Sequence, residues 1–274
     1  MSFTSESPAR LVIVGGGNMG EALLAGLLDA EWCTAADLAV VEVVPARRRE
    51  LTKRHPHVRV SDVVPPCRAA LIAVKPQDVH AATSAAVAAG ATRLLSIAAG
   101  VTIASLEAAA SAAPVDVAVV RAMPNTPAMV RAGASAISPG SAASEADLEW
   151  AAGILGAVGT VVRVPEHQLD AVTGLAGSGP AYLMLVAEAL TEAGVLVGLT
   201  RETARRLVTQ TLLGSARLLD ETGELPEVLR ANVTSPGGTT AAGLRALEER
   251  GVRAAFLEAV MAATERSREL GGPR

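Results

Sequence analysis

Three glycines early in the chain have the spacing of a phosphate-binding loop. Gly15, Gly17 and Gly20 fit the pattern G-x-G-x-x-G, after the apolar run LVIV and before a helical stretch. In that context Gly15 permits a tight turn, Gly17 lets backbone amides approach a pyrophosphate, and Gly20 lets a helix pack on a strand. Amides at the helix start, including those of Asn18 and Met19, then attract the anion. The sequence favours a dinucleotide site over a glycine-rich turn without a ligand.

An acidic residue about 20 residues beyond the glycines bears on the choice of dinucleotide. Glu42 ends the expected second strand, where a carboxylate would accept a hydrogen bond from the ribose 2′-hydroxyl of NADH. NADPH carries a 2′-phosphate, which would need a cation instead, and Arg47, Arg48 and Arg49 follow on the next expected helix. We favour a solvated helix face as the interpretation of these arginines. The choice between NADH and NADPH stays open.

A second glycine-rich segment, TSPGGTT, interrupts an alanine-rich, helix-forming region late in the chain. Pro236 presets a turn, and Gly237 and Gly238 permit backbone conformations that other residues rarely adopt. Thr239 or Thr240 begins the next helix, so backbone amides converge at a helix N-terminus that suits a small anion. An N-capped turn without a ligand explains these residues equally well.

Residue types that hold metals or staple a fold are sparse. There are two cysteines, Cys33 and Cys67, and no CxxC, so we expect no disulfide framework and no metal site. The roles of the four histidines stay open, with surface placement preferred over catalysis for the two that flank Pro56: His55, His57, His80 and His167.

Composition limits the class of protein. Half of the 274 residues are hydrophobic but only 2% are aromatic, so the core must consist of alanine, valine and leucine. Lysine and arginine number 24 against 28 aspartate and glutamate, without a basic run, so we expect no nucleic acid partner. The start, MSFTSESPAR, lacks an apolar stretch before a cleavage site, and the cytoplasm is the expected compartment.

One apolar segment, residues 181–198, has about the length of a short membrane span. It contains Glu188 and Glu192, each of which would be costly in lipid. We therefore predict a buried core helix or a subunit-interface helix here, and no membrane association.

Up to Pro165 the pattern alternates between apolar strands and helical stretches. Such alternation predicts a doubly wound, mostly parallel sheet with helices on both faces, a Rossmann-type α/β domain. The expected strands are 11–14, 38–44, 69–74, 94–98, 115–120, 134–137 and 159–164. The expected helices are 18–30, 45–55, 77–89 and 145–157.

Beyond Pro165 strand signals vanish and helical spacing takes over. Apolar and small residues recur at three- and four-residue steps from Ala204 to Leu219, and Thr200 is a plausible N-cap for that helix. We predict a dinucleotide-binding domain over residues 1–164 and an all-α domain over 165–274. A bundle this small and rich in short side chains would bury its faces in a homodimer.

Four segments together resemble pyrroline-5-carboxylate reductase, from about residue 10 to 270. They are the glycine loop, AVKPQ at 73–77, RAMPNTP at 121–127, and LAGSGPAY at 175–182 followed by VTSPGGTT at 233–240. The resemblance implies a Rossmann domain and a helical domain that interlocks in a dimer, and in many members a decamer. It also implies reduction of the C=N bond of 1-pyrroline-5-carboxylate to L-proline, the last step of proline biosynthesis, by NADPH or NADH.

The resemblance also implies roles for individual residues. Those expected to border the cofactor are Gly15, Gly17, Asn18, Met19, Gly20, Glu42, Val74, Lys75, Pro76, Asn125, Thr126 and Pro127. Those expected to contact the substrate are Ser178, Ser235, Gly237, Gly238, Thr239 and Thr240, with the Thr240 hydroxyl bonded to the ring nitrogen as the catalytic contact. Because an imine can take its proton from water, no strong acid or base is required, which agrees with motifs that lack His, Asp and Glu.

Read without the resemblance, Lys75 is a surface lysine and MPNTP a proline-rich turn. The chain departs from the family pattern at Ala176, where a serine often precedes GSGP. Val43 and Val44 offer no polar contact beyond the second strand.

Two other functions are compatible with part of the sequence. A β-hydroxyacid-type dehydrogenase wants a lysine base in the second domain, but the only lysines, Lys53 and Lys75, fall in the first. A non-catalytic NAD(P)-binding regulator would keep the glycine loop but need not keep TSPGGTT.

Overall fold

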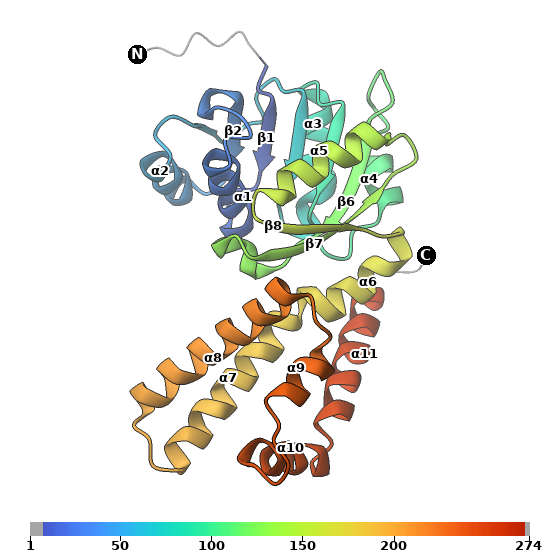
Figure 1. Ribbon diagram of the computed structural model, residues 1–274. Coiled ribbons are helices and arrows are strands. Elements are labelled where there is room, and N and C mark those ends of the chain that lie inside the picture. The colour runs from blue at the N-terminus through green and yellow to red at the C-terminus, as the bar shows by residue number, and fades with distance from the viewer. Residues whose placement is uncertain (1–7, 272–274) are drawn as a thin grey trace. The chain divides into compact units, whose positions relative to one another are not determined.

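The computed structural model describes residues 8–271, which contain one eight-stranded sheet followed by helices (Figure 1). The strand order is β3-β2-β1-β4-β5-β6-β7-β8. Strands β1 to β6 pair in parallel, β7 is antiparallel to β6, and β8 is parallel to β7. The strands are β1 (Leu11–Val14), β2 (Leu38–Val41), β3 (Arg59–Ser61), β4 (Ala69–Ile72), β5 (Arg93–Ser96), β6 (Ala118–Met123), β7 (Gly133–Pro139) and β8 (Gly159–Arg163).

Helices cover both faces of this sheet, as the doubly wound prediction requires. The helices of this part are α1 (Asn18–Asp29), α2 (Pro45–Arg54), α3 (Val79–Ala88), α4 (Ile103–Ala110) and α5 (Glu145–Gly156). Alternate residues of β1 point to opposite faces: Leu11 and Ile13 pack with α1, α2 and α5, whereas Val12 and Val14 pack with α3 and α4. The predicted α/β fold class is confirmed.

Several expected boundaries shift in the structure. Strand β2 ends at Val41, so Glu42 lies just beyond it rather than at its end. Strand β6 begins at Ala118, not Val115, because Val115 is exposed in the preceding loop. The sequence reading missed β3, a short half-buried edge strand, and α4, whose N-cap Thr102 accepts a hydrogen bond from the amide of Ser105.

The chain after β8 is helical, as predicted. Its elements are η4 (Glu166–Gln168), α6 (Leu169–Val172), the π-helical turn η5 (Thr173–Gly177), α7 (Gly179–Leu196), α8 (Arg201–Thr222), α9 (Pro226–Asn232), α10 (Thr239–Glu249) and α11 (Val252–Leu270). Thr200 caps α8 as expected, since its hydroxyl accepts a hydrogen bond from the amide of Thr203.

Internal contacts divide the chain into two compact units. Unit 1 contains the sheet, runs to Ser178 and resumes at Ala262; unit 2 is Gly179–Met261. In unit 1, Ser267 near the end of α11 donates a hydrogen bond to buried Asp170 at 2.9 Å, which fastens the returning chain to α6. The domain boundary near residue 165 stays a prediction.

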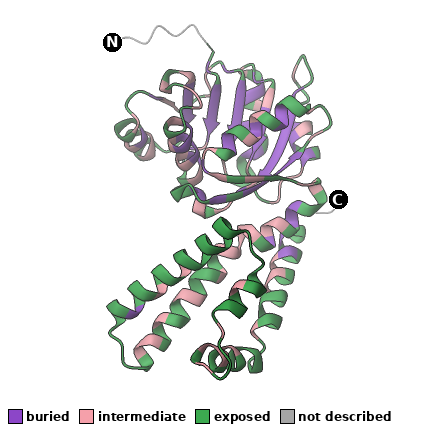
Figure 2. Ribbon diagram, viewed as in Figure 1, coloured by how far each residue is buried: buried purple, intermediate pink, exposed green. Residues whose placement is uncertain are grey.

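Unit 2 has almost no core of its own. Of residues 179–261, all described by the structure, only Ala204 is buried (Figure 2). Large apolar side chains of α7 are exposed, among them Leu183, Met184 and Leu185. Helices with so much exposed apolar surface need a partner surface that covers it.

Residues 166–196 form one continuous helical stretch that is long and apolar enough to cross a membrane. That criterion rests on length and composition alone, and a core helix of a soluble protein also meets it.

Candidate cofactor and substrate sites

The glycine loop joins β1 to α1 and leaves no space for a side chain at two of its three motif glycines. Gly15 has φ +112°, and a Cβ there would lie 2.5 Å from the carbonyl oxygen of Ala73. A Cβ at Gly20 would lie 2.0 Å from the carbonyl oxygen of Gly15. A Cβ at Gly17 would instead meet nothing within 4 Å. The loop is therefore packed against the protein at two glycines and open at the third.

The open side carries unpaired backbone donors. Gly17 is the N-cap of α1, and within the described chain no acceptor faces the amides of Asn18, Met19 and Gly20. Such amides at a helix N-terminus are the donors that bind phosphate groups. The residues at the loop thus fit a pyrophosphate, the anionic centre of a nicotinamide dinucleotide.

Four of the segments named from the sequence meet at one edge of the sheet. The strand order 3-2-1-4-5-6 reverses direction between β1 and β4, and ligands of doubly wound sheets bind at the carboxyl ends of the strands there. The glycine loop follows β1, Glu42 follows β2, Val74 and Lys75 follow β4, and MPNTP begins at the end of β6. Lys75 and Pro76 are exposed where η2 (Pro76–Asp78) begins.

The MPNTP segment is tied to the LAGSGP turn, both within unit 1. The side-chain amide of Asn125 donates to the carbonyl oxygen of Ala176 at 3.1 Å, and its oxygen accepts from the amide of Ala134 at 2.9 Å. A Cβ at Gly177 would lie 2.7 Å from the methyl of Met123. Because Asn125 binds the main-chain carbonyl, this contact does not depend on the side chain at position 176. Asn125 is thus a positioning residue; Thr126, which starts η3 (Thr126–Val130), is exposed, and Pro127 is half-buried.

Arg121, at the start of the same segment, was not assigned a role from the sequence. Its side chain is 5% exposed and donates to Glu166 at 2.9 Å. The same carboxylate oxygen of Glu166 accepts from the amide of Ile103 at 2.7 Å. This pair fastens the chain that leaves β8 to the sheet. A lone arginine in a strand gives no sequence signal of such a pair.

The backbone of the LAGSGP segment is helical throughout. Residues 173–177 form a π-helical turn, in which the amide of Ser178 donates to the carbonyl of Thr173 at 2.8 Å, and α7 begins at Gly179. Ser178 is half-buried. Single π-turns of this kind are frequent at functional sites.

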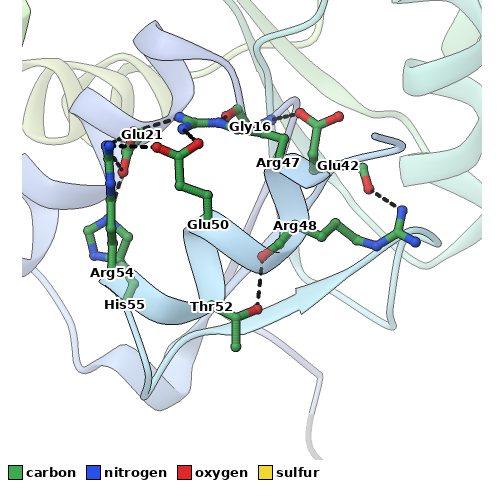
Figure 3. A network of polar contacts seen from close by, with 9 residues as sticks. All are labelled: Gly16, Glu21, Glu42, Arg47, Arg48, Glu50, Thr52, Arg54 and His55. Atoms are coloured by element: carbon green, nitrogen blue, oxygen red, sulfur yellow. Dashed lines mark hydrogen bonds and ion pairs between the residues drawn. The ribbon is translucent and has the colours of Figure 1, made fainter. Parts of the chain in front are cut away.

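The arginines after β2 do not form a simple solvated face (Figure 3). The Nε of Arg47 donates to the carbonyl of Gly16 at 2.8 Å, and its terminal nitrogens bind Glu21 and Glu50. Arg48 donates to the carbonyls of Glu42 and Val43. Only Arg49 of the three is exposed. Arg47 and Arg48 therefore hold loop carbonyls in place, and the predicted solvated helix face is wrong for these two residues.

Glu21, in the first turn of α1, forms ion pairs with Arg47 and Arg54. Burial opposes its ionisation, but hydrogen bonds from Arg47 and Arg54 outweigh burial and lower the pKa of Glu21 below its ordinary value. The Nε2 atom of His55 lies 3.3 Å from the same carboxylate, with the His55 side chain only 15% exposed. The expected surface placement therefore fails for His55 and holds for the exposed His57, since His55 ends α2 against α1.

TSPGGTT lies wholly in unit 2 and has the predicted form of a turn before a helix. Gly237 has φ +70°, Gly238 is the N-cap of α10, and Thr239 begins that helix. The amide of Gly238 is used inside the turn, where it donates to the carbonyl of Ser235 at 3.0 Å. The converging donors without acceptors in the described chain are instead the amides of Thr239, Thr240 and Ala241. Ala241 was not expected, because its side chain carries no signal.

The hydroxyl of Thr240 is half-buried and has no hydrogen-bond partner among residues 8–271. Ser235 is exposed, and its Oγ lies beside Gly238, where a Cβ would approach it to 2.3 Å. The turn can therefore offer backbone amides to an anion and a neutral hydroxyl to a polar atom beside it. Among the described residues, no group of three or more His, Cys, Asp or Glu side chains can hold a metal.

Gly17→Val is predicted to fold normally and to lose dinucleotide binding by about tenfold or more, because the new side chain fills the space that the pyrophosphate needs. Calorimetric titration with the reduced cofactors measures the loss. Gly156→Val is the matched control, since a Cβ there also meets nothing within 4 Å. Undiminished binding by Gly17→Val would remove the loop from the cofactor site.

Glu21→Gln is predicted to lower the free energy of unfolding at pH 7 by about 1–3 kcal/mol, because the charged hydrogen bonds to arginine weaken. The lowered pKa of Glu21 means that its stabilisation is present above the carboxyl pKa of the unfolded chain and is lost as pH falls through the folded value. Urea unfolding at pH 7 and below pH ~4 should therefore show the difference shrinking in acid. Exposed Glu145, paired with Arg163, supplies the control Glu145→Gln, for which we expect a much smaller change. A pH-independent difference would contradict the charge assignment.

Comparison with known proteins matches both parts of the chain. The family model described as pyrroline-5-carboxylate reductase dimerisation matches residues 166–270, and that described as NADP oxidoreductase, coenzyme F420-dependent, matches residues 10–100. The pyrroline-5-carboxylate reductase of Synechocystis sp. is 47% identical over 268 residues, which cover 96% of this chain and 98% of that one. That of Mycobacterium tuberculosis is 44% identical and covers 96% and 97%.

Solved structures agree. The pyrroline-5-carboxylate reductase of Coxiella burnetii superposes with a TM-score of 0.88 at 32% identity, over 97% of this chain and all (100%) of that one. The Plasmodium falciparum pyrroline carboxylate reductase, solved with NADP bound, superposes with a TM-score of 0.82 at 29% identity, over 96% and 98%. With such identity along nearly its whole length, the chain belongs to the pyrroline-5-carboxylate reductase family.

Proposed function

We propose that this chain reduces the C=N bond of 1-pyrroline-5-carboxylate to give L-proline, the last step of proline biosynthesis, with two sets of helix-terminal amides binding the two anionic groups of the reactants. The observation that carries the proposal is the pair of helix starts, α1 and α10, each preceded by glycines and each with unpaired amides in the described chain. Family membership supplies the reaction.

The glycine loop binds the dinucleotide. The amides from Gly17 to Gly20 bind the pyrophosphate, Glu42 faces the adenosine ribose, and Val74 to Pro76 with MPNTP border the nicotinamide end. NADPH or NADH supplies the hydride when bound. The protein's part is to hold the nicotinamide ring in place and exclude water around it. The hydrogen bonds from Asn125 to Ala176 and Ala134 support this role, because they fix the segment that borders the ring.

The TSPGGTT turn binds the substrate. Its carboxylate accepts hydrogen bonds from the amides of Thr239 and its neighbours and from the Ser235 hydroxyl. Gly237, with φ +70°, and Gly238, the N-cap, shape the turn that presents these donors. The Thr240 hydroxyl bonds the ring nitrogen and so holds the ring in one orientation. Ser178 is placed by the π-helical turn and lines the substrate.

These contacts are uncharged because the reaction demands little proton transfer from the protein. Water can protonate an imine nitrogen, and hydride addition then needs orientation more than an acid or base. Neither rival function is favoured: Lys53 and Lys75, both exposed and both in unit 1, leave unit 2 without the lysine base of a β-hydroxyacid dehydrogenase.

The functional molecule is a homodimer or a larger assembly such as a decamer, located in the cytoplasm, without membrane or nucleic acid partners. Support comes from the match of residues 166–270 to a dimerisation region and from the exposed apolar side chains of α7 and α8. Residues 1–164 then form the cofactor domain and 165–274 the domain that binds substrate and dimerises.

The direct assay mixes purified protein, pyrroline-5-carboxylate and NADH or NADPH, and follows the absorbance of the reduced cofactor. We expect decay that depends on all three components and formation of proline. Cofactor binding without decay for either cofactor would favour a non-catalytic regulator.

Thr240→Val is predicted to lower turnover by about 10- to 100-fold with cofactor affinity near normal, because one hydrogen bond to the reacting ring is lost. Thr240→Ser keeps the hydroxyl and should retain most activity. Steady-state kinetics and cofactor titration separate the two effects. Equal turnover in the two variants would exclude the hydroxyl from catalysis.

Leu185→Glu is predicted to dissociate the oligomer at micromolar concentration, because a carboxylate replaces a leucine on the apolar surface of α7, where Leu185 is 66% exposed in the single chain. Sedimentation velocity measures the assembly. Ala85→Glu places the same charge on the exposed side of α3 and should leave the assembly intact. An unchanged sedimentation coefficient for Leu185→Glu would place the interface elsewhere.

A further inference from the structure

The cofactor preference can be argued from the carboxylate of Glu42. Oε2 accepts a hydrogen bond from the amide of Gly16 at 3.2 Å, and Oε1 accepts from the amide of Val44 at 2.8 Å. These two amides fix the carboxylate beside the glycine loop (Figure 3). Each carboxylate oxygen can still accept from a further donor, such as a ribose hydroxyl.

Two of the three arginines that follow β2 are already bound within the protein. Arg47 is bound to the Gly16 carbonyl, Glu21 and Glu50, and hydrogen bonds to those two carboxylates raise its pKa further. Arg48 is bound to the carbonyls of Glu42 and Val43 and to Asp62. Moving either guanidinium to a new anion would leave a half-buried carboxylate or carbonyl without its partner.

The charges in this cluster leave no positive surplus. Three arginines, Arg47, Arg48 and Arg54, pair with the carboxylates of Glu21, Glu50 and Asp62. The carboxylate of Glu42 is bound by backbone amides and adds a further negative charge. The chain between β2 and α2 adds only Val43 and Val44, both exposed and apolar. A phosphate placed here would meet the negative charge of Glu42, and of Arg47, Arg48 and Arg49 only Arg49 has no side-chain partner in the described chain.

We infer that this enzyme prefers NADH to NADPH, with Glu42 as the specificity-determining residue that binds the ribose hydroxyls and repels a 2′-phosphate. The inference rests on the proposed binding of the dinucleotide at the glycine loop. It concerns the adenosine end only, so it can fail while that binding stands.

Calorimetric titration of the full-length protein with NADH, NADPH, 5′-AMP and 2′,5′-ADP tests the preference without turnover. We expect NADH to bind about tenfold tighter than NADPH or better, and 5′-AMP to bind tighter than 2′,5′-ADP, because close like charges are strongly unfavourable. The catalytic efficiencies with the two cofactors should follow the same order.

Glu42→Gln keeps the shape of the side chain and removes its charge. We expect the ratio of NADPH to NADH dissociation constants to fall by about tenfold, whereas Glu42→Asp keeps the charge and should keep the preference for NADH. Glu31→Gln is the control, since Glu31 is exposed and its side chain has no partner in the described chain. A uniform loss of affinity for both cofactors in Glu42→Gln would mean a structural role and overturn the assignment.

Arg49 is the residue that could instead favour NADPH, because its side chain is exposed and unpaired within residues 8–271. If NADPH binds as tightly as NADH or tighter, and Arg49→Gln weakens NADPH alone, then Arg49 binds the 2′-phosphate and the inference is wrong. Failure of both dinucleotides to bind the wild-type protein would instead contradict the glycine-loop site itself.

Discussion

The approach of α1 to the end of β1 is the constraint on which the cofactor site depends. A Cβ at Gly20 would stand 2.0 Å from the carbonyl oxygen of Gly15, and one at Gly15 would stand 2.5 Å from that of Ala73. These two contacts hold the first amides of α1 at the point where the sheet order reverses. Any side chain at either glycine would move the helix and with it the donors.

The polar groups around this constraint are mostly used for positioning. Arg47 fastens the Gly16 carbonyl, Asn125 fastens the LAGSGP turn, and Arg121 with Glu166 fastens the chain after β8. These charged side chains are thus used in the scaffold, and the groups that the two helix starts offer to ligands are neutral amides and hydroxyls. That division suits a hydride transfer to an imine, for which orientation matters more than proton transfer.

Unit 2 shows the other constraint, that a helix must bury its apolar face. Its residues are exposed almost throughout, with Ala204 the single buried one among residues 179–261. The apolar stripe seen in the sequence from Ala204 to Leu219 is real, but the chain by itself does not cover it. Membership in a family with a dimerisation region supplies the reason.

The sequence alone predicted a doubly wound sheet, seven of its eight strands and the turn that begins α10, because continuous apolar runs, glycine spacing and proline act locally. It also indicated the family, because four short segments with the family's motifs occur together. Tertiary structure decided the rest. The partners of Arg47, Arg48 and His55 depend on side chains brought together from three elements, which no local pattern encodes. The donors at the two helix starts are main-chain amides, and for that reason the side chain of Ala241 gives no signal in the sequence. The amide of Gly238 is not free for a ligand, because the turn folds back and this amide donates to the carbonyl of Ser235.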